Sequence, residues 1–136
     1  MHENKGVAIQ LCDKDFLNNF NPDFLALYDL NTWDKSMGSR DRLNLVKEAS
    51  VDAILVDSSL SYNTDSLLCW GATLKTGGYL ILEAIEYCHP QILADNLEMI
   101  FEYQPISEKS HVWFLRKRAL ADQESLKQNL SHQLLN

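Results

Sequence analysis

Short apolar runs separated by polar turns recur along the chain and predict a β-sheet. Residues 51–57, VDAILVD, are rich in large aliphatic side chains, which is typical of a strand buried on both faces. Five further runs predict strands on the same grounds. The six predicted strands are residues 6–11, 24–30, 51–57, 79–82, 99–104 and 112–115.

Helical spacing and turn residues fall between these runs. Phe16, Leu17 and Phe20 predict a single turn or short helix, and residues 21–23, NPD, predict a turn. Residues 40–48 have the apolar period of a short helix, and a further helix is expected to begin at Pro90.

The stretch from residue 51 to residue 85 organises the rest of the chain. Asn63 or Thr64 can cap a helix there, Lys75 is expected in its last turn, and Gly77–Gly78 has the composition of a left-handed C-cap. Strand, helix and strand then make a parallel βαβ unit. The last two predicted strands are joined by so short a loop that they must be antiparallel.

We therefore expect a three-layer α/β fold with a mostly parallel sheet of about six strands and an antiparallel C-terminal pair. Residues 1–118 are predicted to form this domain. Residues 119–136 are predicted to be a polar helical tail or the start of a linker, with Leu126, Leu130 and Leu134 on one side.

Composition narrows the class of protein. The chain has 136 residues, of which 46% are hydrophobic, enough for one core, and its formal net charge is −7. Such a charge argues against nucleic-acid binding, and we interpret the one basic run, residues 116–118, as a solvated strand end. The chain shows no export signal and no apolar run of membrane-spanning length, so we expect a cytoplasmic protein that does not bind membranes. We also expect a monomer.

Cysteine and histidine patterns predict no metal site. Cys12, Cys69 and Cys88 are far apart with no CxxC pair, and reduced, buried thiols are the simplest interpretation. The four histidines are scattered. The sequence contains no GxSxG, Walker or HExxH motif, so hydrolase, nucleotide-binding and zinc-protease chemistry have no signal here.

The middle of the chain resembles a known fold family. Residues 51–57, followed by a helix and by LKTGGYLIL at 74–82, resemble the fourth and fifth strands of class I S-adenosylmethionine-dependent methyltransferases, which carry an FDVI strand and an LKPGG turn. The closing antiparallel pair is similar to the last strands of that family. The resemblance covers about half the chain and implies a Rossmann-like, degenerate methyltransferase fold.

The front of the chain departs from that family. Methyltransferases of this class place a glycine-rich loop after their first strand, where the backbone must approach the cofactor closely. Here residues 12–16 are CDKDF, without glycine, and the loop after residue 57 lacks an NPPY-type motif. If the chain is a methyltransferase, the resemblance implies a cofactor site near Asp13, Asp29, Asp57 and Ser58.

Each of these assignments has a structural alternative. Asp29, expected at the end of the second strand, or Asp13 would bind the ribose, although carboxylates are common at strand ends. Asp57 and Ser58 would lie near the methyl group, although Asp57 can equally cap its loop. Tyr62 or Trp33 would form a pocket wall or simply pack as aromatic residues.

A preserved back half without the glycine loop resembles the N-terminal domain of the anamorsin family of cytosolic iron–sulfur cluster assembly factors. The stretches VAIQLCDKD, LKTGGYLILEAI and EMIFEYQPISEKSHVWFLRKR carry the resemblance. It implies a non-catalytic interaction or scaffold domain that binds no cofactor. The family's iron–sulfur cluster belongs to a C-terminal region that this sequence does not contain, so none of the three cysteines inherits that role.

The family resemblance also implies partners. A diflavin reductase, which supplies electrons, and other cluster-assembly proteins are the expected ones. We expect the contact face to be the loop at residues 31–39, with Trp33 and Asp34, together with the acidic strand ends, Asp29 among them. Two alternatives stay open: a small or fragmentary methyltransferase, and a pseudoenzyme subunit of another assembly with an open α/β fold.

Overall fold

The computed structural model describes residues 5–32, 50–60, 64–83, 100–104 and 111–119. These residues contain one six-stranded sheet with the order β2-β1-β3-β4-β6-β5. The strands are β1 (Gly6–Leu11), β2 (Tyr28–Thr32), β3 (Val51–Val56), β4 (Leu74–Glu83), β5 (Phe101–Gln104) and β6 (Val112–Lys117). The first four run parallel, whereas β6 is antiparallel to both β4 and β5. The expected mixed sheet with an antiparallel C-terminal pair is confirmed.

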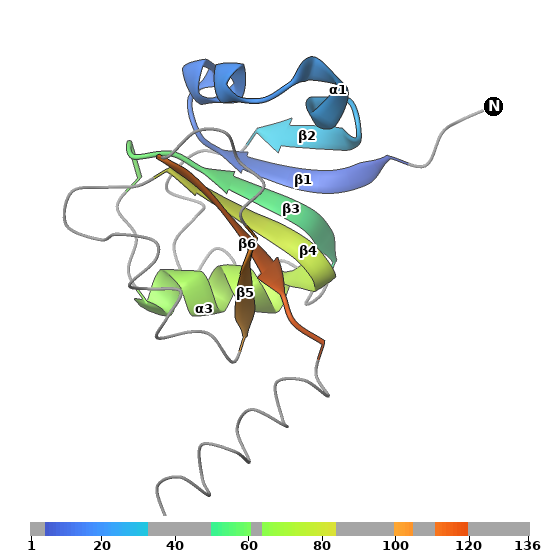
Figure 1. Ribbon diagram of the computed structural model, residues 1–136, viewed down its shortest axis with the longest axis vertical. Helices are drawn as coiled ribbons and strands as arrows, with labels where there is room; N and C mark the ends of the chain where they lie inside the picture. Colours follow the sequence, from blue (N-terminus) through green and yellow to red (C-terminus); the bar gives the residue numbers. More distant parts are fainter. Residues whose placement is uncertain (1–4, 33–49, 61–63, 84–99, 105–110, 120–136) are drawn as a thin grey trace, which may run out of the picture.

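Helices cover both faces of this sheet (Figure 1). The 3-10 helix η1 (Lys14–Asn19) and the short α1 (Pro22–Leu25) lie on one side, and α3 (Thr64–Thr73) lies on the other. Successive side chains along each strand point to opposite faces of the sheet, so the protein has two cores. Ile54 and Val56 of β3 face α3, while Ala53 and Leu55 face η1 and α1. The parallel β3-α3-β4 unit and the three-layer arrangement are therefore as expected.

The predicted strand at residues 24–30 is wrong in its first half. Pro22 occupies the start of α1, and the side chain of Asn21 accepts a hydrogen bond from the backbone N–H of Asp23 at 2.8 Å. A proline in the first turn behind an asparagine cap favours a helix over the turn that residues 21–23 predicted. As a result β2 begins only at Tyr28 and extends to Thr32.

The predicted glycine C-cap of α3 is also wrong. The helix ends at Thr73 and β4 begins with the next residue, so Lys75 lies in the strand. Contacts from distant parts of the chain satisfy the helix end: the Ser50 N–H donates to the Thr73 carbonyl at 2.9 Å, and Lys117 Nζ donates to the Leu74 carbonyl at 2.7 Å. No glycine is needed there.

Gly77 and Gly78 instead belong to a bulge in β4. Val51 pairs with Leu74 and Ala53 pairs with Tyr79, so the single residue Asp52 faces residues 75–78. Gly77 has a φ of 82°, a conformation that favours glycine. A Cβ on Gly78 would lie 2.8 Å from the backbone oxygen of Asp52. The glycines are therefore required by the bulge.

Several predictions fall on residues outside the described ranges. They are the helix at 40–48, the helix at Pro90, most of the 31–39 loop, the cap at 63, Cys88 and the tail after residue 119. Thr64, the other predicted cap, is the first residue of α3. Among the residues that the structure describes, no helix is long and apolar enough to cross a membrane.

Candidate functional site

The candidate ligand-binding site lies at the carboxyl ends of β1 and β3. β2 lies beyond β1 on one side and β4 lies beyond β3 on the other, so the strand order reverses between β1 and β3. In open α/β sheets, ligands bind outside the carboxyl ends of the strands at such a switch point. Asp13 follows β1, and Asp57 and Ser58 follow β3. The structure therefore brings three of the four predicted site residues to one edge.

Asp57 is buried at this switch point and uses both carboxylate oxygens within the protein. It is 5% exposed. Oδ2 accepts a hydrogen bond from the backbone N–H of Asp13 at 2.8 Å, and Oδ1 accepts from the Ser59 N–H at 3.1 Å and from the Ser59 hydroxyl. The first of these bonds runs from the end of β3 to the end of β1. Asp57 thus joins the two loops between which a ligand would lie.

The backbone after β1 turns directly into η1. Asp13 has extended backbone angles at the N-cap position, and the Phe16 N–H donates to its carbonyl oxygen at 3.1 Å. Cys12 and Phe16 are buried, whereas the side chain of Asp13 is exposed. The segment CDKDF therefore forms a compact turn that Cys12 and Phe16 anchor in the core, in the place where the resemblance implies a glycine-rich loop.

Two side chains that sequence reasoning did not single out complete this edge. Gln10, 5% exposed, donates from Nε2 to the Cys12 carbonyl at 3.2 Å, and its Oε1 lies 3.4 Å from the Thr32 hydroxyl. Glu83, the last residue of β4, accepts from the Ser58 N–H at 2.7 Å. An amide in the otherwise apolar strand GVAIQL was the available signal for Gln10.

Asp29 is not brought together with the other predicted residues. It is the second residue of β2 and pairs with Val7 near the start of β1, so it lies toward the amino ends of the strands. The reason is the late start of β2 after α1. The carboxyl end of β2 is Thr32, so the described part of this strand end supplies a hydroxyl and no carboxylate for a ribose.

The described cysteines lie on opposite faces of the sheet. Cys12 belongs to the core that faces η1 and α1, and Cys69 packs against the core that faces α3. They cannot act on one ligand together. Within the described ranges, no group of three or more histidine, cysteine, aspartate or glutamate side chains is placed to hold a metal ion. His111 contacts Asn19, with Nε2 and Oδ1 3.2 Å apart.

Comparison with known proteins finds likeness at the level of structure. No protein-family model and no curated protein matches the sequence. Haemonchus contortus phosphoethanolamine N-methyltransferase 2 in complex with S-adenosyl-L-methionine superposes with a TM-score of 0.51 at 14% identity, over 85% of this chain and 34% of that chain. Its complex with phosphomonomethylethanolamine and S-adenosylhomocysteine gives a TM-score of 0.50 at 15% identity, with the same coverage.

A 16S rRNA N2 G1207 methyltransferase of T. thermophilus gives a TM-score of 0.49 at 12% identity, over 88% of this chain and 37% of that chain. The chain thus spans about a third of the length of these solved structures. At such identities the likeness is one of fold alone. The two Haemonchus structures and the sheet order together establish that this chain has a Rossmann-like, methyltransferase-like fold.

Proposed function

We propose that this chain is a non-catalytic interaction domain on a methyltransferase-like fold, of the kind found in anamorsin-type proteins of cytosolic iron–sulfur cluster assembly. The observation that carries the proposal is the hydrogen bond from the Asp13 N–H to Asp57 across the switch point. A cofactor that needs close approach to the backbone after β1 meets a turn without glycine, held in place by a buried carboxylate.

The charge at the same edge supports a docking role. Asp13 and Asp15 are exposed beside the end of β1, and the half-buried Glu83 ends β4. Acidic side chains gathered on one edge of a protein with net charge −7 favour a partner with a basic surface. In the anamorsin-type assignment this partner is the diflavin reductase, with other cluster-assembly proteins as further partners.

The two cysteines in the described part of the chain fit a domain that carries no cluster of its own. Cys12 and Cys69 are buried or half-buried in separate cores on opposite faces of the sheet. Cluster ligation needs several thiolates directed at one point. The proposal therefore leaves cluster binding to other parts of an anamorsin-type protein and assigns contact with partners to this domain.

A second candidate is an S-adenosylmethionine-dependent methyltransferase, and a specific observation favours it. The two Haemonchus structures of similar fold are complexes with S-adenosyl-L-methionine and S-adenosylhomocysteine. Asp13, Asp57 and Ser58 lie at the edge where such a fold binds ligands. Two observations argue against a methyltransferase. Asp57 accepts hydrogen bonds from within the protein, and Asp29 lies toward the opposite edge of the sheet.

A ligand titration separates the two candidates. S-adenosylmethionine and S-adenosylhomocysteine are added to the 15N-labelled protein while amide chemical shifts are recorded. The proposal expects no saturable shifts up to the solubility of either ligand. Saturable shifts centred on the amides of Asp13, Asp57 and Ser58 would reject the proposal and favour the methyltransferase.

A charge reversal then tests the docking edge against the diflavin reductase. Asp15→Lys is expected to weaken binding several-fold at low salt, with a smaller effect at high salt, because it places a cation on the acidic edge. Asp29→Lys is the matched control, since Asp29 is equally exposed but lies toward the other edge of the sheet. Equal effects of the two substitutions, or none from Asp15→Lys, would refute this contact face.

A further inference from the structure

A cavity lies at the opposite edge of the sheet, where the parallel strands begin. Its volume is about 250 Å³. Its walls come from the starts of β1 and β2, from Asp52 of β3 and from the bulge of β4. The bulge creates the space, because residues 75–78 leave the strand path opposite the single residue Asp52. Nothing proposed for the carboxyl edge uses this cavity.

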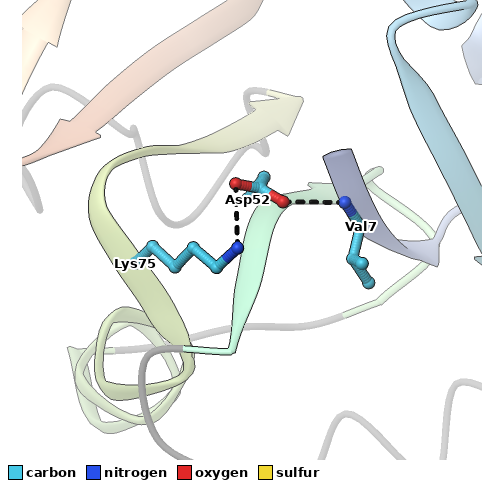
Figure 2. Close-up of polar contacts among 3 residues, drawn as sticks. All are labelled: Val7, Asp52 and Lys75. Atoms are coloured by element: carbon cyan, nitrogen blue, oxygen red, sulfur yellow. Dashed lines mark hydrogen bonds and ion pairs between the residues drawn. The ribbon is translucent and has the colours of Figure 1, made fainter. Parts of the chain in front are cut away.

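A loose ion pair forms one side of the cavity. Figure 2 shows Asp52 between β1 and β4, with one carboxylate oxygen accepting from the Val7 N–H at 2.7 Å. The other oxygen lies 3.6 Å from Lys75 Nζ, beyond ordinary hydrogen-bond distance. The two side chains are 32% and 50% exposed, so the pair contributes at most about 1 kcal/mol. An ammonium group from outside can therefore replace Lys75 at Asp52 at little cost.

Two tyrosines form another side. Their rings are anchored by edge-to-face contacts in the aromatic cluster of the core: Tyr28 with Phe24 at 5.5 Å between ring centres, and Tyr79 with Phe114 at 5.9 Å. Burial, with the charges of Tyr79 and Asp52, raises the pKa of the Tyr28 phenol. The hydroxyl of Tyr28 therefore stays protonated at neutral pH and can donate a hydrogen bond.

Both signs of charge and an apolar wall are present in this small space. Leu27, which is 60% exposed, adds the apolar wall. A ligand with only a positive charge would pair with Asp52 and gain nothing from Lys75. A ligand with only a negative charge would have to approach Asp52. A ligand with both charges can bind each side chain through the opposite charge.

We propose that this cavity binds a small zwitterion of the α-amino-acid class, with its ammonium group on Asp52, its carboxylate on Lys75 and an apolar side chain against Leu27. The volume falls below the range of about 300–1,000 Å³ typical of pockets for drug-sized ligands, which fits a molecule of this size. The proposal goes beyond the docking function and does not rest on it, because the two sites lie at opposite edges of the sheet.

The test uses L-leucine and two analogues that each lack one charge. 15N-labelled protein is titrated with leucine, with isopentylamine, which lacks the carboxylate, and with 4-methylpentanoate, which lacks the ammonium group. Leucine is expected to shift the amides of Val7, Asp52, Gly77 and Gly78 in a saturable way. Each analogue is expected to bind about fivefold more weakly, because it loses one contact with a half-exposed charged side chain.

Substitutions assign the two charged contacts. Asp52→Asn keeps an acceptor for the Val7 N–H, and Lys75→Met keeps the aliphatic stem, so both are expected to fold. Each is expected to weaken leucine binding about fivefold. Lys14→Met, which removes the same charge from η1 after the carboxyl end of β1, is the control and is expected to leave binding unchanged. Dispersed amide spectra verify that each variant is folded.

Two results would overturn the proposal. The first is the absence of saturable shifts with leucine up to its solubility. The second is isopentylamine binding as tightly as leucine, with Lys75→Met unchanged. That result would indicate a site for a lone cation, such as a basic side chain of a partner protein, instead of a zwitterion.

Discussion

Replacing Asp57 with alanine tests whether this carboxylate stabilises the folded protein or serves only to bind a ligand. Its oxygens accept hydrogen bonds from the backbone N–H groups of Asp13 and Ser59, at 2.8 and 3.1 Å, and from the Ser59 hydroxyl. The alanine variant removes every one of these acceptors. It therefore disconnects the turn after β1 from the turn after β3.

The magnitude follows from the two backbone donors. A hydrogen bond to a charged group is worth about 1.5–3 kcal/mol. Asp13 and Ser59 are exposed residues, so water takes over part of each lost bond and the lower value applies. The expected loss for Asp57→Ala is therefore about 3 kcal/mol in the free energy of unfolding, or about 10 °C in Tm for a domain of this size.

Asparagine at the same position should lose about half as much. Its single carboxamide oxygen can accept from one of the two backbone N–H groups, while its NH2 group meets the other as a second donor. The expected loss for Asp57→Asn is about 1.5 kcal/mol. Stability should thus decrease from the natural protein to the asparagine variant and then to the alanine variant.

Urea unfolding followed by circular dichroism measures these differences. The control is Asp15→Asn, which removes an exposed carboxylate from η1 and is expected to change stability by less than about 0.5 kcal/mol. If Asp57→Ala unfolds at the same urea concentration as the natural protein, the carboxylate does not join β1 to β3 and stays available to a ligand at this edge.

Three further predictions concern the bulge, the tyrosine beside it and the cap of α1. Gly78→Ala is expected to lower the free energy of unfolding by about 3 kcal/mol, because the new Cβ would lie 2.8 Å from the backbone oxygen of Asp52. Gly77→Ala should lower it by only about 1 kcal/mol, because Gly77 has a φ of 82° but only a flexible side chain nearby. Urea unfolding distinguishes the two variants. The pKa of Tyr28 in the folded protein is raised above its unfolded value of about 10. Its contribution to stability is therefore fully present below a pH of about 10 and is lost as the pH rises through the folded pKa. Tyr28→Phe should remove this part of the loss of stability at alkaline pH, which urea unfolding at several pH values measures. Asn21→Ala removes the acceptor at the start of α1 and is expected to lower the free energy of unfolding by about 1 kcal/mol, measured as a lower Tm.

Much of the fold could be predicted because its strands are locally distinct. In β3 every residue but Asp52 is buried, so an unbroken apolar run predicted a strand covered on both faces. A short connection between two such runs required the antiparallel pairing of β5 and β6. These inferences need only neighbouring residues, and they were right.

The candidate site could be predicted only in part. Asp13, Asp57 and Ser58 follow strands whose carboxyl ends meet, so their shared edge was predictable from the strand order that the resemblance implied. Gln10 contacts Thr32 and Glu83 contacts Ser58 across neighbouring strands, and the local sequence does not show which residues will face each other there. Their roles depend on the register of neighbouring strands.

The sequence by itself determined the α/β class, the central βαβ unit and the missing glycine loop, since each depends on residues adjacent in the chain. The tertiary structure decided where α3 ends and which edge Asp29 occupies. Ser50 satisfies the end of α3 from outside the helix, which frees Gly77 and Gly78 to form the bulge. The local sequence pattern reflects the conformations that a residue favours, whereas backbone hydrogen bonds between distant segments determine which of these conformations it adopts.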